Sequence, residues 1–202
     1  MVQQSDQQLV RTALLKLPWF TVGVLVLQFA CFVASNLSTT ESSFFSLQAV
    51  DFAQLERWGF DLGNPLRTAG LTLVTSFFIH SGWEHFLSNM GMAFMILVLA
   101  ERTFGKSRIC LYLLVGHLCG LLGASLAHRF LSQPPLVMGM SAGIFTVAAN
   151  LLSARFGKTA WSIAGVFGLI YVFVDPAGFT AHALAILVGL AGLPFMSQKS
   201  PA

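Results

Sequence analysis

Five polar side chains stand within otherwise apolar stretches of this chain, and their types could do chemistry together. They are three histidines, one asparagine and one serine: His80, His85, Asn89, Ser141 and His182. A serine hydroxyl becomes a useful nucleophile only when a base removes its proton, and a neutral histidine is the usual base. These residue types make Ser141 a candidate nucleophile and His182 a candidate base for the hydrolysis of a peptide bond.

Such a reaction also needs hydrogen-bond donors that face the negative oxygen of the transition state. The backbone N–H of Ser141, the side-chain amide of Asn89 and the ring of His85 are the candidates. Asn89 follows His85 by one helical turn, so both side chains lie on the same helix face. Gly139 and Gly143 flank the serine and permit a close approach of the backbone.

The composition places these residues in a membrane protein. The chain of 202 residues is 55% hydrophobic and only 9% charged, whereas an ordinary soluble domain is about 25% charged. The net charge of +3 could suggest nucleic acid, but the basic residues form short clusters between apolar runs, as membrane loops do. We therefore expect no nucleic-acid partner. The cysteines Cys31, Cys110 and Cys119 lie in or beside apolar runs without a CxxC pair, which favours packing roles and predicts no metal site and no cofactor.

Six apolar stretches predict an all-α, polytopic membrane protein with six transmembrane helices in a single membrane-embedded domain, residues 1–202. The predicted spans are approximately residues 17–34, 83–100, 109–127, 137–154, 160–174 and 179–196. Most approach the roughly 20 residues that cross a bilayer. The fifth is the shortest, and residues 175–180 after it are predicted to be a loop. The long first loop, residues 35–82, mixes aromatic and charged residues, which favours amphipathic segments in the membrane interface. The first apolar run lacks a small-residue cleavage site, so it is predicted to be a retained helix.

The distribution of lysine and arginine predicts the orientation of these spans. Of the 11 basic residues, eight fall on the side that holds both termini: Arg11, Lys16, Arg102, Lys106, Arg108, Arg155, Lys158 and Lys199. The other side receives Arg57, Arg67 and Arg129. Cytoplasmic loops carry the excess of basic residues. We therefore expect a multi-pass protein of a bacterial inner (cell) membrane with both termini in the cytoplasm, and the second, fourth and sixth spans then run from outside to inside.

This orientation brings the polar residues to a common depth. A strongly polar side chain within a span costs about 2.5–3.5 kcal/mol on insertion scales, so each one needs a reason. His85, Ser141 and His182 each fall within roughly two turns of the outer end of their spans, about 5–10 Å deep. Small residues recur every four positions in the last span: Ala181, Ala185 and Gly189. This pattern predicts close packing against the fourth span, which would bring His182 to Ser141.

These motifs resemble those of the rhomboid family of intramembrane proteases. Residues 80–89 (HSGWEHFLSN) are similar to its second-helix signature, and residues 139–143 (GMSAG) to its GxSG nucleophile motif. Residues 181–189, which begin with Ala-His and end with glycine, resemble the histidine motif of its last helix, and residues 101–105 (ERTFG) resemble its cytoplasmic signature. Ala142 stands where the family usually has glycine. The long first loop and six spans agree, so the likeness covers nearly the whole chain.

The resemblance implies a six-helix rhomboid-like bundle and a serine endopeptidase with a Ser–His dyad that lacks an acidic third member. It implies that Ser141 is the nucleophile and His182 the base, and that His85 and Asn89, beside Gly139, support the oxyanion. The implied substrates are transmembrane or near-membrane segments of other proteins. The expected partners are therefore transmembrane protein substrates and the lipid bilayer.

Three further residues have secondary roles in this prediction. His80 lies at the mouth of the second span and is a candidate for structural or water-binding support. Phe145, four residues after Ser141, could stack on the ring of His182. His117 lies among the glycines of the third span, and we interpret it as a helix-packing residue.

Other functions remain open from the sequence. An inactive rhomboid-like protein would bind transmembrane clients without cutting them, although such relatives typically lack the serine or the histidine. A rhombosortase, which processes proteins with a particular C-terminal tail, is a specialised alternative. A metalloprotease is suggested by His80, Glu84 and His85, but HExxH is absent and the two histidines lie about 140° apart on a helix. A transporter could line its path with polar residues, yet it needs no serine with a matching histidine.

Overall fold

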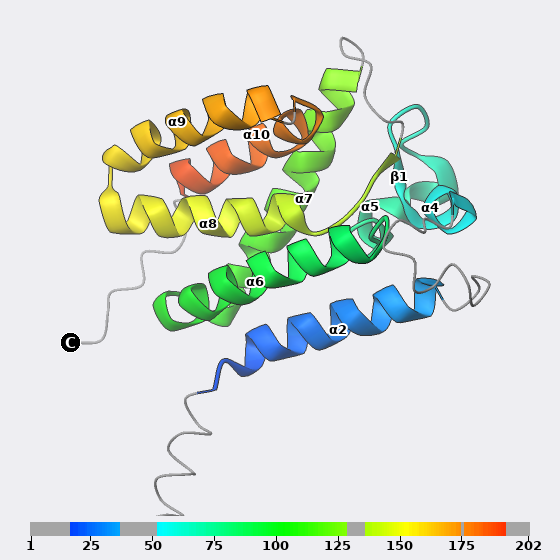
Figure 1. Cartoon of the computed structure of the whole chain (residues 1–202), viewed down its shortest axis with the longest axis horizontal. Coiled ribbons are helices and arrows are strands. Elements are labelled where there is room, and N and C mark those ends of the chain that lie inside the picture. The colour runs from blue at the N-terminus through cyan, green and yellow to red at the C-terminus, as the bar shows by residue number, and fades with distance from the viewer. Residues whose placement is uncertain (1–16, 37–51, 129–135, 175, 193–202) are drawn as a thin grey trace, which may run out of the picture.

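The structure is a computed structural model that describes residues 17–36, 52–128, 136–174 and 176–192, and it is mostly helical (Figure 1). In chain order the described elements are α2 (Trp19–Asn36), α4 (Phe52–Trp58), β1 (Phe60–Asp61), the 3-10 helix η1 (Arg67–Gly70), α5 (Thr72–Thr75), α6 (Trp83–Thr103), α7 (Lys106–His128), β2 (Leu136–Val137), α8 (Ser141–Phe156), α9 (Thr159–Val174) and α10 (Pro176–Ala191).

Three of these helices, α2, α6 and α7, are long and apolar enough to cross a membrane by length and composition. They contain 18, 21 and 23 residues. The helices α8, α9 and α10 contain 16 residues each, which corresponds to about 24 Å of helix. Each predicted span overlaps one of these six helices, while the number of helices that cross the membrane stays a prediction.

Two of the boundaries that differ from the sequence-based expectation have a clear physical cause. The predicted fourth span starts at residue 137, whereas α8 begins at Ser141, because β2 pairs antiparallel with β1 and places Val137 opposite Phe60. The loop predicted for residues 175–180 is wrong for residues 176–180, which are helical. α10 begins at Pro176, and proline suits the first position of a helix because its missing N–H is not needed there. Residue 175 lies outside the described residues.

The described part of the first loop is folded and lies at one end of the helix bundle (Figure 1). α4, β1, η1 and α5 gather there, beside the N-terminal ends of α6 and α8. Phe60 and Leu62 are buried and pack with Leu121 and Ala124 of α7. These apolar contacts fix the loop segment against the bundle, next to the point where α6 and α8 begin.

The helices α7, α8 and α10 pack with their backbones close together. A Cβ at Gly143 of α8 would lie 2.5 Å from the carbonyl oxygen of Leu113 in α7. A Cβ at Gly120 of α7 would lie 2.9 Å from the carbonyl oxygen of Ala181 in α10. Only glycine permits such approaches, so small residues set the spacing of these three helices.

The last helix packs against α8 along the face of small residues noted in the sequence. A Cβ at Gly189 would collide with the carbonyl oxygen of Thr146 and lie 2.7 Å from the Cβ of Ala149. The hydroxyl of Thr146 donates to the carbonyl oxygen of Ala185 over 2.8 Å, and the amide of Asn150 donates to that of Gly189 over 3.3 Å. These contacts hold α10 in register with α8.

Replacement of Gly189 by leucine is therefore expected to destabilise the protein, although it makes the helix more apolar. Overpacking of a tight contact typically costs about 1–3 kcal/mol. Gly91→Leu is the matched control, because a Cβ at Gly91 meets nothing within 4 Å. The measurement is the thermal midpoint of both variants in detergent. A midpoint of Gly189→Leu equal to that of Gly91→Leu would contradict the close packing of α10 on α8.

The first helix joins the bundle through α6, which lies between α2 and α8 (Figure 1). The Glu101 carboxylate near the end of α6 accepts hydrogen bonds from the backbone N–H of Phe20 at 3.0 Å and of Thr21 at 2.9 Å. It also accepts one from the Thr21 hydroxyl at 2.9 Å. A carboxylate is favourable at a helix N-terminus, where the backbone N–H groups lack partners. Phe32 and Phe86 stack nearer the other end of α2, with ring centroids 4.3 Å apart.

Candidate active site

The site begins at the sharp turn that leads into α8. Ser141 is the first residue of this helix. Gly139, two residues earlier, has a φ of +93°, a backbone conformation that residues with a Cβ rarely adopt. A Cβ at this position would lie 3.0 Å from Nε2 of His85 and 3.2 Å from Nδ2 of Asn89. Glycine is therefore required for the turn and for the close approach of two side chains from α6.

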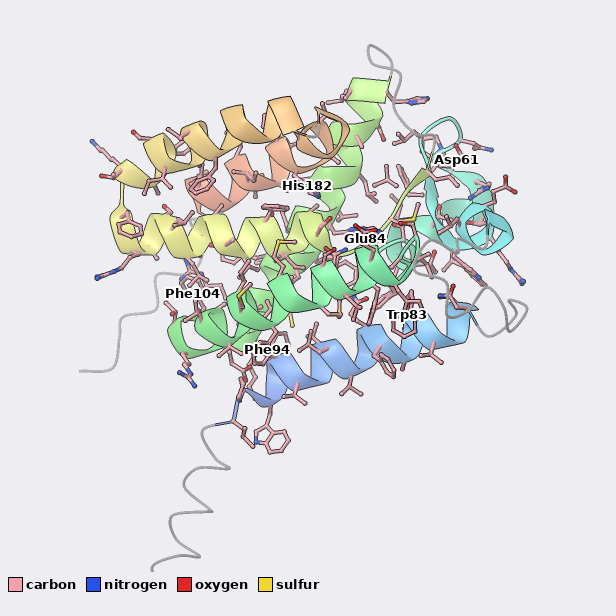
Figure 2. The ribbon with its side chains drawn as sticks, viewed as in Figure 1. Asp61, Trp83, Glu84, Phe94, Phe104 and His182 are labelled. Atoms are coloured by element: carbon pink, nitrogen blue, oxygen red, sulfur yellow. The ribbon has the colours of Figure 1, made fainter. Side chains whose placement is uncertain are left out.

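The serine and the histidine of the sequence prediction lie in direct contact. Ser141 Oγ is 2.7 Å from Nε2 of His182, which extends from α10 toward α8 (Figure 2). His182 is 9% exposed, so the ring is shielded while the serine remains partly accessible. The Phe145 ring contacts the imidazole with centroids 4.7 Å apart and a tilt of 43°. With Nε2 unprotonated, the hydroxyl donates to it, which is the geometry that a general base needs.

His85 presents an N–H group toward the turn before Ser141. Its Nδ1 lies 3.3 Å from the backbone nitrogen of Ser81 and 3.0 Å from the Ser81 hydroxyl. A backbone N–H can only donate, so Nδ1 accepts and the neutral ring carries its proton on Nε2. That nitrogen lies 3.0 Å from the Cβ position of Gly139. His85 is thus arranged as a hydrogen-bond donor beside the turn that precedes Ser141.

Asn89 supplies a second donor at the same place. The side chain is 2% exposed, and its Nδ2 has no hydrogen-bond partner within the part of the chain that the structure describes. A buried donor without a partner costs about 1–3 kcal/mol. Nδ2 lies beside Gly139. An oxygen atom of a bound substrate at this place could accept its hydrogen bond and so satisfy the buried donor.

His80 supports the ring of His85 and does not join the serine–histidine pair. It is 3% exposed, its Nδ1 donates to the carbonyl oxygen of Phe78 at 3.3 Å, and its ring meets that of His85 with centroids 5.1 Å apart. It precedes the first residue of α6. The pKa of His80 is lowered to about 3, mainly by burial and next by the proximity of His85. The hydrogen bond to the Phe78 carbonyl oxygen acts in the opposite direction and raises this pKa. His80 is therefore uncharged at neutral pH.

No metal centre can be built from the side chains that the structure places. Within residues 17–36, 52–128, 136–174 and 176–192, no group of three or more histidine, cysteine, aspartate or glutamate side chains could hold a metal ion. Glu84, which was considered with His80 and His85 for a metalloprotease site, is exposed at the start of α6 (Figure 2).

The structure also identifies polar residues to which the sequence assigned no role in the site. Ser81, inside the motif of residues 80–89, fixes the tautomer of His85, while Thr146 and Asn150 join α8 to α10. Thr146 and Asn150 are one helical turn apart within an apolar helix, and this spacing was the signal that could have identified them. Ser76 and His117 form a third such group.

Comparison with known proteins agrees with the family resemblance drawn from the sequence. Residues 67–199, well over half of the chain, match the family model described as Rhomboid domain. The chain is also similar to human Rhomboid-related protein 3, with 28% identity over 149 residues, which cover 74% of this chain and 34% of that protein. The chain therefore spans about a third of the length of this relative.

Proposed function

The chain belongs to the rhomboid family, and from this premise we propose that it is an intramembrane serine endopeptidase that cleaves transmembrane or near-membrane segments of other membrane proteins. The family includes serine proteases, and its fold is that of a multi-pass integral membrane protein. The observation that carries the proposal is the 2.7 Å contact between Ser141 Oγ and His182 Nε2. The two donors beside Gly139 support it.

The proposed reaction proceeds in two stages. The hydroxyl oxygen of Ser141 bonds to the scissile carbonyl carbon while its proton passes to Nε2 of His182. The carbonyl oxygen takes up the negative charge and accepts hydrogen bonds from His85 and Asn89. His182 then gives its proton to the leaving amine as the C–N bond breaks, which leaves an ester on Ser141. In the second stage, water attacks the carbonyl carbon of this ester and gives a proton to His182. The bond to Ser141 Oγ then breaks, the substrate fragment leaves with its new carboxyl group, and His182 returns the proton to Ser141.

Placement in the membrane is part of the proposal. Six spans with both termini in the cytoplasm put the starts of α6 and α8 near the outer surface, where water can reach Ser141. The basic residues support this orientation. Single cysteines in a cysteine-free background provide the test, at Asn64 of the first loop and at Lys158 between α8 and α9. An impermeant thiol reagent on intact cells should label Asn64→Cys and spare Lys158→Cys, and the reverse pattern would invert the orientation.

A fluorophosphonate provides a test of the chemistry that does not require a known substrate. This reagent phosphonylates serine hydroxyls that a base activates, so the wild-type protein should be labelled at Ser141. A zinc chelator should leave both labelling and cleavage unchanged. Cleavage that the chelator abolishes, in a protein that resists the phosphonate, would identify a metalloprotease and reject the serine mechanism.

A further inference from the structure

The turn that precedes Ser141 is attached to a segment of the first loop. The backbone N–H of Gly139 donates to the carbonyl oxygen of Ser76 at 2.7 Å. Ser76 follows directly after α5 and is completely buried. Because Gly139 lies between the nucleophile and the two donors of α6, the position of the Ser76 carbonyl helps to set the position of that turn.

Ser76 is in turn held by a histidine from α7. Nε2 of His117 lies 3.2 Å from the Ser76 hydroxyl oxygen and 3.1 Å from the carbonyl oxygen of Leu73. A carbonyl oxygen can only accept, so Nε2 carries the proton and its N–H is shared between the two oxygens. His117 is 2% exposed, and the Phe77 ring meets its ring edge-on with centroids 5.2 Å apart. The histidine thus binds Leu73 within α5 and Ser76 directly after this helix.

The helix that carries His117 is itself fixed against the helix of the nucleophile. A Cβ at the adjacent Gly116 would lie 3.0 Å from the carbonyl oxygen of Ala142, the residue after Ser141. α7 is therefore connected to the start of α8 in two ways. Gly116 contacts Ala142 directly, and His117 contacts Ser76, whose carbonyl oxygen binds the Gly139 turn before Ser141.

We propose that His117 and Ser76 are positioning residues for the proposed peptidase reaction, since together they hold the Gly139 turn at the distance that the nucleophile and the oxyanion donors require. The inference rests on the proposed function. A histidine is rare and costly within an apolar span, and simple packing between helices would be served by leucine. Its shared N–H gives the polar side chain a specific use, because displacement of a reacting group by about 1 Å can reduce a rate by roughly 100-fold.

His117→Phe is the first test, because it keeps a planar ring against Phe77 and removes the N–H. In the purified full-length protein, kcat for a transmembrane substrate should fall about 10–100-fold while KM changes less than about 2-fold. The rate of fluorophosphonate labelling at Ser141 should fall in parallel. Leu118→Ala, on the exposed side of α7, is the matched control and should keep the wild-type kcat.

Two further variants separate positioning from packing. His117→Gln should restore kcat to within about 3-fold of wild type, because its amide nitrogen takes the place of Nε2. Ser76→Ala should lower kcat about 3–10-fold and should cause little further loss in combination with His117→Phe, since the two residues act as one unit.

The outcomes distinguish this inference from the proposed function. Wild-type kcat in Ser76→Ala, or an equal loss in His117→Gln and His117→Phe, would overturn the inference and leave the peptidase intact. The inference also fails if the thermal midpoint falls while kcat of the folded protein does not. If His117→Phe does not fold, Ser76→Ala and His117→Gln decide. A wild-type protein that cuts nothing and is not labelled at Ser141 would overturn the peptidase and the inference together.

Discussion

Ser141→Ala and His182→Ala are each expected to reduce cleavage of a transmembrane substrate to the background level. The hydroxyl and the imidazole are 2.7 Å apart, so removal of either one leaves the other without its partner in the proton transfer. Losses of about 10⁴–10⁶-fold in kcat are typical when one member of such a unit is removed. The measurement is cleavage of a panel of tagged membrane proteins by the purified wild type and by each variant.

The double variant gives the more specific result. Because the two residues act together, Ser141→Ala with His182→Ala should be no less active than either single variant. Ser153→Ala is a suitable control, since this α8 serine donates to the carbonyl oxygen of Leu190 at 3.0 Å and lies three turns beyond Ser141. The control should keep the wild-type kcat. Residual cleavage in Ser141→Ala that disappears only in the double variant would contradict a single catalytic unit.

The same experiment separates the rival functions. An inactive rhomboid-like protein would cut nothing in any form and would still bind its client when Ser141 is replaced. A rhombosortase would depend on Ser141 and His182 but would cut only substrates that carry its particular C-terminal tail. Cleavage that survives Ser141→Ala and is sensitive to a chelator would reject the serine mechanism altogether.

The contacts between the predicted catalytic residues followed from short-range features of the sequence. The repeat of small residues at Ala181, Ala185 and Gly189 marks one helix face, and that face packs on α8. Such a face can meet only another helix backbone or lipid, so the pairing of Ser141 with His182 was predictable once both were placed near the outer ends of their spans.

Contacts that depend on the first loop could not be predicted in the same way. Nothing local assigns the Val137 segment to a strand, because a short apolar run fits a helix equally well, and its partner Phe60 lies far away in the chain. The start of α10 is different, because Pro176 was a usable signal for a helix where a loop was expected. The sequence favoured helix packing for His117, because its hydrogen bond to Ser76 depends on the folded position of the first loop.

The tautomer of His85 also could not be predicted from the sequence, nor could the lack of a partner for Nδ2 of Asn89 among the described residues. Both observations bear on what replacement of Asn89 should do. Nε2 of His85 and Nδ2 of Asn89 lie 3.0 Å and 3.2 Å from the Cβ position of Gly139. A mere packing asparagine in an apolar environment would be expected to satisfy its buried N–H groups. In contrast, a donor that stabilises the oxyanion has a hydrogen-bond partner only while the oxyanion exists during the reaction.

Asn89→Ala is therefore expected to lower kcat by about 10²–10³-fold, the typical loss for one oxyanion donor, with little change in KM. Activity should not vanish, because His85 and the Ser141 backbone N–H still donate. The thermal midpoint should change little, because the amide nitrogen that is lost has no partner among the described residues. Asn150→Ala is the matched control with the opposite pattern: its amide donates to the Gly189 carbonyl oxygen at 3.3 Å, so the midpoint should fall while kcat remains near wild type. If Asn89→Ala cleaves at the wild-type rate and unfolds at a lower temperature, Asn89 is a packing residue and the assigned donor is wrong.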